Sequence, residues 1–300
     1  MKSKYVNLFT DFGFKKIFGE EASKPLLIDF LSSLLPDTKI VSLSFKDKEK
    51  LGKTQEDRKA IYDIYCENDK GEKIIIELQK AKQNYFKDRT VYYATFPIQK
   101  QAEKGDWNYE LKAVFCIGVL DFTFDEKSKI SKAEVMHTVL LKDQNNQPFY
   151  DKLKFVYLEM PNFTKKEKEL KTRLDKWLYF IKHSEDIVKI PEIFKDKIFV
   201  QAFEKAEIAK YSETERKNYE ASLKTYRDLK GVIDTAFDDG QIKGKAEGKA
   251  EGKAEGKVEG KAEGKIEEKF ATAKLMKEEG EPIEKIIRFT KLTKKIIENL

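Results

Sequence analysis

The chain has 300 residues, of which 40% are hydrophobic and 37% are charged, so it is long enough to bury a sizeable core. Its net charge of +6 is small beside 59 basic and 53 acidic side chains, and overall charge therefore gives no argument for nucleic-acid binding. No run approaches the roughly 18 to 20 apolar residues that span a bilayer, and the two cysteines are too few for a disulfide framework. We therefore expect a cytoplasmic protein with no membrane partner.

The first predicted elements are a helix and three strands. Leucine and phenylalanine recur at helical spacing over residues 22–35, which predicts an amphipathic helix that ends near Pro36. Apolar, β-branched runs then predict strands at residues 40–45, 60–67 and 73–79. We expect the helix to pack on the sheet that these strands form.

A second helix and three more strands are predicted next. Residues 83–104 combine aromatic and basic side chains in a helical pattern, which Pro97 is expected to kink or interrupt. Apolar runs predict strands at residues 110–120, 135–141 and 155–159. This order of helices and strands is typical of an α/β protein.

The last part of the chain is helical in pattern but changes abruptly in composition. Residues 164–239 predict an α-helical cap, and a four-residue Gly-Lys-Ala-Glu repeat fills residues 240–265. Each glycine inside a helix costs about 0.8 to 1 kcal/mol relative to alanine, and like charges four residues apart repel. We therefore expect a semi-flexible charged spacer that can become helical when it packs against a partner, followed by a helical tail at residues 266–300. Repeat and tail are candidate surfaces for a homo-oligomer, although the absence of heptads disfavours a coiled-coil scaffold.

The most informative residues are acids inside predicted strands. Asp63 lies in an apolar run, and Glu77 and Gln79 lie in the next one. A charged side chain in such a run is usually paired, exposed at a site or bound to a metal, because its burial alone is costly. The turn Asn68–Gly71 predicts a hairpin that brings Asp63 opposite Glu77, with Glu77 and Gln79 on one face. The simpler alternative is that both acids face solvent on a half-exposed sheet.

An Asp on one strand and Glu-x-Gln on the next resemble the active-site motif of the PD-(D/E)XK nuclease superfamily. Three further segments are similar, in order and spacing, to the Rpn family of recombination-promoting nucleases. They are Thr10–Gly19 (TDFGFKKIFG), Phe86-x-x-Arg89-x-x-Tyr92-Tyr93, and Leu158–Phe163 (LEMPNF). The resemblance implies a restriction-endonuclease-like α/β core over residues 1–163, with a mixed central sheet flanked by helices. The cap at residues 164–239, the spacer and the helical tail would follow this core.

The resemblance also implies a metal-dependent DNA endonuclease that serves recombination or mobile elements. Mg²⁺, or Mn²⁺ or Ca²⁺ in its place, would be held by Asp63, Glu77 and the main-chain carbonyl of Leu78, since hard cations prefer oxygen ligands. Gln79 stands at the third position, where Lys is common in the superfamily. A glutamine carries no charge, so its expected role is to orient a water while the metal supplies the base.

Basic and aromatic residues after Gln79 are the candidate DNA contacts. Lys82, Arg89 and Tyr92 lie on or beside the predicted helix, and Lys59 precedes the first acidic strand. The resemblance singles out Arg89, because a guanidinium can bind phosphate through two hydrogen bonds. A solvated helix face over an aromatic core explains the same residues equally well.

The uncharged Gln79 keeps a second function open. In this alternative the chain is a catalytically degenerate nuclease fold that binds DNA or assembles through its repeat and tail. Such a module would bind DNA without metal. An extra carboxylate from Asp11, Glu20 or Glu21 is a further candidate for the metal cluster of an active enzyme.

Overall fold

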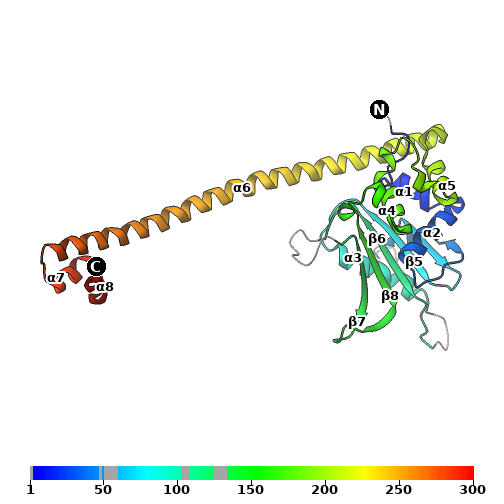
Figure 1. Ribbon diagram of the computed structural model, residues 1–300. Helices are drawn as coiled ribbons and strands as arrows, with labels where there is room; N and C mark the ends of the chain where they lie inside the picture. Colours follow the sequence, from blue (N-terminus) through cyan, green and yellow to red (C-terminus); the bar gives the residue numbers. More distant parts are fainter. Residues whose placement is uncertain (1–2, 47–48, 51–59, 103–107, 125–133) are drawn as a thin grey trace. The chain divides into compact units, whose positions relative to one another are not determined.

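A computed structural model describes residues 3–46, 49–50, 60–102, 108–124 and 134–300 (Figure 1). The chain divides into two compact units, one ending at Gly231 and one running from Val232 to Leu300. Among the described residues, no helix combines the length and the apolar character that crossing a membrane requires.

The first unit is built on a mixed sheet of six strands. In spatial order they are β1 (Leu43–Phe45), β4 (Ile64–Asn68), β5 (Lys73–Gln79), β6 (Val114–Leu120), β8 (Pro148–Glu159) and β7 (Met136–Lys142). Strands β5, β6 and β8 run parallel, whereas the pairs β1–β4, β4–β5 and β7–β8 are antiparallel. A separate antiparallel pair consists of β2 (Glu49–Lys50) and β3 (Ala60–Ile61). The predicted mixed sheet is confirmed, but β8 starts earlier than predicted, because its first half pairs only with β7.

Helices cover both faces of this sheet (Figure 1). One face carries α1 (Asp11–Phe18), α2 (Lys24–Leu34), α4 (Arg173–His183), α5 (Lys197–Ala206) and the beginning of α6 (Glu213–Glu278), and the other carries α3 (Phe86–Gln99). Side chains of a strand alternate between faces, so Ile74 and Ile76 of β5 enter the larger core while Ile75 packs on the α3 side. Single 3₁₀ turns lie at Glu21–Ser23, Met160–Asn162, Glu167–Glu169, Ser184–Asp186, Glu192–Phe194 and Ile208–Lys210.

The helices after residue 163 share the core of the sheet. The ring of Trp177 in α4 lies 5.5 Å from that of Phe18 and 5.9 Å from that of Phe30, measured between centroids. Arg173 joins Asp29 of α2 to Asp196 at the start of α5. These helices therefore belong with the sheet to the first compact unit, which continues to Gly231.

Pro97 lies inside α3 and does not interrupt it, so the predicted interruption does not occur. The helix continues to Gln99, so the proline falls in its last turn. Proline has no N–H to donate to the carbonyl four residues earlier, which here belongs to Tyr93. The hydroxyl of Tyr62 donates to that carbonyl instead, at 3.0 Å, and this bond also ties α3 to the strand region before β4.

The second unit consists of the rest of α6 with two short helices, α7 (Ile283–Thr290) and α8 (Lys294–Glu298). Ala273, Ile286 and Ile297 form its small core. Residues 240–265 are helical throughout, whereas the sequence predicted a semi-flexible spacer. Three of every four residues in the repeat are good helix formers. The packing of α6 at Ala273 offsets the free-energy cost of nucleating the helix.

Gly13 in α1 is expected to be essential for stability. A Cβ atom at this position would lie 2.3 Å from the main-chain oxygen of Asn7 and 2.8 Å from Oγ1 of Thr10, the N-cap of α1. Gly13→Ala must therefore shift backbone, and we expect it to lower the free energy of unfolding by about 2 kcal/mol or more in denaturant titrations. Gly248→Ala is the matched control, because nothing lies within 4 Å of its added Cβ. Equal stability of the two variants would contradict the prediction.

Candidate functional site

Asp63 and Glu77 lie opposite each other at the open end of the β4–β5 hairpin. The last pair of this ladder is Ile64 with Ile76. Asp63 directly precedes β4, and Glu77 is the next residue of β5. Beyond this last pair, the Asp63 carboxylate bonds β5 in place of a main-chain carbonyl. Its Oδ2 accepts a hydrogen bond of 2.9 Å from the Leu78 main-chain N–H. The predicted hairpin is confirmed, with Gly71 of its turn at a φ of +77°.

Glu77 is a half-buried carboxyl with one unsatisfied oxygen. Its Oε1 is buried and has no hydrogen-bond partner among the residues that the structure describes. Burial raises the pKa of Glu77 to about 8, and the negative charge of Asp63 adds to this rise, whereas Arg89 and Lys15 oppose it. The Asp63 side chain is only 18% exposed. The alternative in which both acids simply face solvent does not hold.

Lys15 of α1 reaches this pair of carboxyls. Its Nζ lies 3.2 Å from Oδ1 of Asp63. A second ion pair, 2.8 Å between Lys80 and Asp11, also connects α1 with the end of β5. The sequence contained a signal for Lys15, because it belongs to the segment Thr10–Gly19, but its proximity to Asp63 was not predicted.

The Gln79 amide is engaged by neighbouring protein groups. Its Nε2 donates to the carbonyl of Ala81 at 2.9 Å, and its Oε1 accepts from Nη2 of Arg89. Arg89 also donates from Nη1 to Oε1 of Gln83 at 2.5 Å, and it lies over the rings of Phe86 and Tyr93. Arg89 thus anchors Gln79 beside Glu77.

The other predicted site residues are spread around this centre. Lys82 is exposed, and Tyr92 on α3 is 45% exposed, so both side chains can be reached by a large ligand. Lys59 lies outside the described residues. The candidate extra carboxylates are occupied by lysines instead of joining the acidic pair. These ion pairs are Asp11 with Lys80, Glu20 with Lys16 and Lys205, and Glu21 with Lys24.

The site fits a divalent cation that keeps several of its waters. Within the parts of the chain that the structure describes, no group of three or more His, Cys, Asp or Glu side chains could hold a metal ion. Two carboxylates and a main-chain carbonyl nevertheless suffice for Mg²⁺, which is usually bound by one or two carboxylates. The unpartnered Oε1 of Glu77 is a vacant oxygen ligand. The Leu78 N–H points to Asp63. In an extended strand the N–H and the carbonyl of one residue point to the same side, so the Leu78 carbonyl also points toward the side where Asp63 lies.

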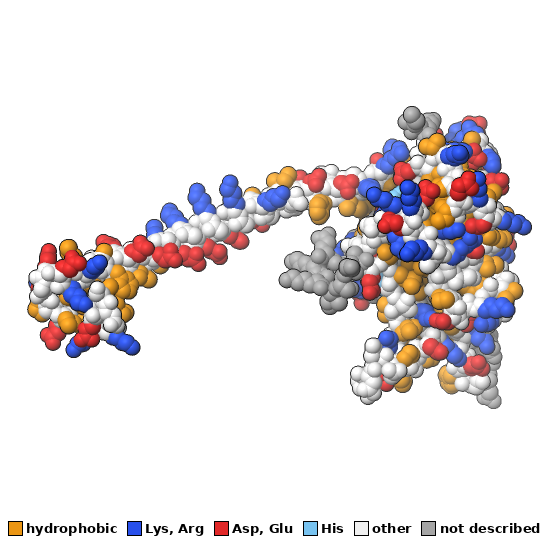
Figure 2. Space-filling model, in the orientation of Figure 1, with side chains coloured by type: hydrophobic (Ala, Val, Ile, Leu, Met, Phe, Trp, Pro, Cys, Tyr) orange, Lys and Arg blue, Asp and Glu red, His pale blue; other side chains and the backbone are white. Residues whose placement is uncertain are grey.

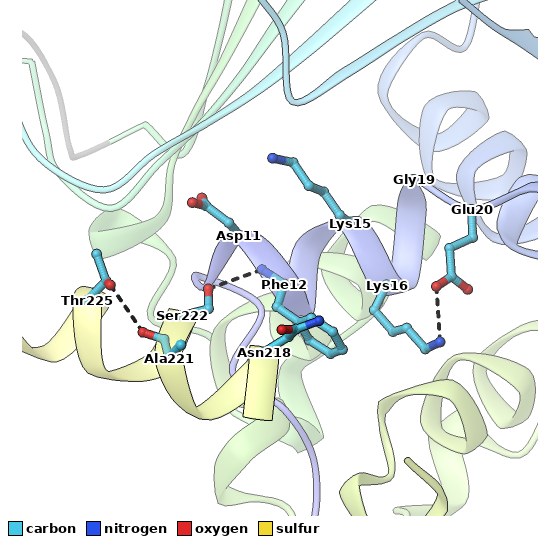
Figure 3. Close-up of a pocket in the computed structure, with 10 residues that line it drawn as sticks. All are labelled: Asp11, Phe12, Lys15, Lys16, Gly19, Glu20, Asn218, Ala221, Ser222 and Thr225. Atoms are coloured by element: carbon cyan, nitrogen blue, oxygen red, sulfur yellow. Dashed lines mark hydrogen bonds and ion pairs between the residues drawn. The ribbon is translucent and has the colours of Figure 1, made fainter. Parts of the chain in front are cut away.

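A cavity of about 550 Å³ lies between α1 and the first turns of α6 (Figure 3). Its lining includes Asp11, Lys15, Lys16, Asn218 and Ser222. Figure 3 shows Asp11 and Lys15 extending from α1 toward the strands, whereas Lys16 extends away from them to Glu20. Since Lys15 also contacts Asp63, this side chain connects the wall of the cavity with the carboxyl pair.

A family model described as PD-(D/E)XK nuclease family transposase matches residues 8–236. The chain belongs to this family. No curated protein and no solved structure was found to match it. The mixed sheet with flanking helices is accordingly a restriction-endonuclease-like fold. As a PD-(D/E)XK nuclease family member, the chain is assigned to phosphodiester hydrolases that generally use divalent metal ions. The match covers the first unit from residue 8 onward and leaves out the glycine repeat and the tail.

Proposed function

We propose that this PD-(D/E)XK nuclease family protein is a metal-dependent DNA endonuclease that acts in recombination or in the movement of mobile elements. The observation that carries the proposal is the buried, unpartnered oxygen of Glu77 opposite the carboxylate of Asp63. Mg²⁺, Mn²⁺ or Ca²⁺, held by Asp63, Glu77 and the Leu78 carbonyl, would lower the pKa of a water and neutralise charge on the scissile phosphate.

The side chains around the acids have distinct roles in this proposal. Lys15 supplies the positive charge that Gln79 lacks, because its ammonium group is already beside Asp63. It stabilises negative charge that develops on the phosphate. Gln79 is a positioning residue, fixed by Arg89 and Ala81 next to Glu77. The exposed Lys82 and Tyr92, together with Lys59, contact the DNA backbone away from the scissile bond.

Lys15→Met is expected to lower the cleavage rate at saturating DNA and metal by about 10- to 100-fold, because the variant loses a charge at the reacting phosphate. Calorimetric titration of the variant with Mn²⁺ is expected to show binding retained. Lys16→Met is the matched control on the same helix, since Lys16 pairs with Glu20 and Glu215 and not with Asp63. A Lys15→Met enzyme as active as Lys16→Met would remove Lys15 from the mechanism.

The activity is tested by incubating the purified chain with supercoiled plasmid and Mg²⁺, Mn²⁺ or Ca²⁺. We expect nicked and linear products that disappear with a chelator. Plasmid left intact with all three ions would contradict the proposal.

The engaged amide of Gln79 favours one second candidate, a non-catalytic module that binds DNA. A gel-shift assay separates the two functions. The module would bind DNA equally well with and without metal. In calorimetry, the unchanged chain would show no metal binding that depends on Glu77, so Glu77→Gln would give the same result.

A further inference from the structure

In the second unit, α6 carries a row of apolar residues that are exposed at every position except its last, Phe270, which is partly buried. Every fourth position from Ile242 to Phe270 is apolar. The row consists of Ile242, Ala246, Ala250, Ala254, Val258, Ala262, Ile266 and Phe270. Its large members are among the most exposed apolar side chains of the unit, with Ile242 at 68%, Val258 at 69% and Ile266 at 52%. Contiguous exposed apolar surface of this kind usually marks an interaction site.

Lysines line one edge of this row, and glutamates line the other. Each residue from Ala246 to Phe270 is preceded by a lysine, and each from Ala246 to Ile266 is followed by a glutamate. Successive helix positions are separated by about 100°, so the lysines form one edge, the glutamates form the other, and glycines occupy the opposite face. Figure 2 shows basic and acidic side chains on opposite sides of this stretch.

We propose that the apolar row of α6 binds the same row of a second copy of the chain, with the two helices parallel. In a parallel two-fold pair, the lysine edge of one helix faces the glutamate edge of its partner on both sides of the contact. An antiparallel pair would place lysine against lysine and glutamate against glutamate, which repel. The row is therefore electrostatically complementary to itself in one orientation only.

The four-residue period also fixes how the helices cross. It exceeds the 3.6 residues of a helical turn, so the row winds around α6 by about 40° per repeat. Two such rows pack as interdigitating ridges at a crossing angle of about −50°. Contact is then concentrated on the central turns around Val258, where Ala254 and Ala262 allow the backbones to approach closely.

Sedimentation equilibrium of the full chain, without DNA or metal, tests the apolar contact. The unchanged chain is expected to dimerise, and Val258→Lys is expected to raise the dissociation constant at least about tenfold. Gly256→Lys is the matched control. It places the same side chain two residues away on the opposite face, where nothing lies within 4 Å of an added Cβ, and is expected to dimerise like the unchanged chain. A monomeric unchanged chain, or equal dissociation constants for the two variants, would overturn the proposal.

Charge exchange tests the orientation. One variant replaces the edge glutamates at 247, 251, 255, 259, 263 and 267 by lysine, and a second replaces the edge lysines at 245, 249, 253, 257, 261 and 265 by glutamate. Each variant alone is expected to be monomeric, and an equimolar mixture is expected to form a heterodimer. Variants that still form homodimers, or a mixture that stays monomeric, would overturn the parallel arrangement. Neither result depends on whether the first unit cleaves DNA.

Discussion

Asp63→Asn and Glu77→Gln are each expected to reduce metal-dependent DNA cleavage by more than about a hundredfold. Loss of a residue that only supports a metal ligand typically costs 10- to 100-fold, and these two residues are proposed to be the ligands themselves. Each substitution keeps the shape of the side chain while it removes an anionic oxygen pair. The measurement is the initial rate of plasmid nicking over a range of Mg²⁺ concentrations.

Glu67→Gln is the control for this comparison. Glu67 lies on β4, where it pairs with Lys73 and Lys46 at the end of the strand away from Asp63. Its loss is expected to leave the nicking rate within a few fold of the unchanged enzyme. Full activity of Asp63→Asn or Glu77→Gln would show that the cation is held elsewhere or is not needed.

Glu77→Gln is also expected to stabilise the metal-free protein at alkaline pH. Burial, with the charge of Asp63, raises the pKa of Glu77 from 4.5 to about 8 in the folded chain. Between these values the unfolded chain releases this proton while the folded chain keeps it, so wild-type stability falls as pH rises. Glutamine does not titrate. The gain in the free energy of unfolding is therefore near zero below pH 4.5 and on the order of 5 kcal/mol above pH 8.

Denaturant titrations with chelator at pH 5 and pH 8.5 measure this effect, and Glu67→Gln provides a control of opposite sign. Burial of Glu67 opposes ionisation, but Lys73 and Lys46 outweigh it and lower the pKa of Glu67. Its ion pairs stabilise the fold above its unfolded pKa, so Glu67→Gln is expected to destabilise the protein at pH 8.5. Equal stability of Glu77→Gln and the unchanged protein at pH 8.5 would mean that Glu77 is not held in a desolvated position.

Local signals explain why much of the sheet and the acidic pair were predictable. The β-branched runs and the turn with Gly71 specify the β4–β5 hairpin, and a two-residue side-chain period then sets Asp63 opposite Glu77. The approach of Lys15 to Asp63 was not predictable, because it depends on how α1 docks on the sheet. The engagement of Gln79 by Arg89 likewise depends on the placement of α3.

Tertiary packing accounts for the differences in the second half of the chain. The sequence pattern after residue 163 predicts helices, but it does not predict which core they join. In the structure, Trp177 packs α4 into the core beside the sheet. In the repeat, the free-energy costs of glycine and of neighbouring like charges in a helix predicted a semi-flexible spacer. Helix formers and packing at Ala273 outweigh them in α6.

The most direct test is a crystal of the protein soaked in Mn²⁺ and measured for anomalous scattering. A single strong peak is expected within about 2.0 to 2.3 Å of the Asp63 carboxylate and of Oε1 of Glu77, with the Leu78 carbonyl nearby and waters completing the shell. No peak there at saturating Mn²⁺, or a cation bound only by other residues, would contradict the assignment of this hairpin as the metal centre.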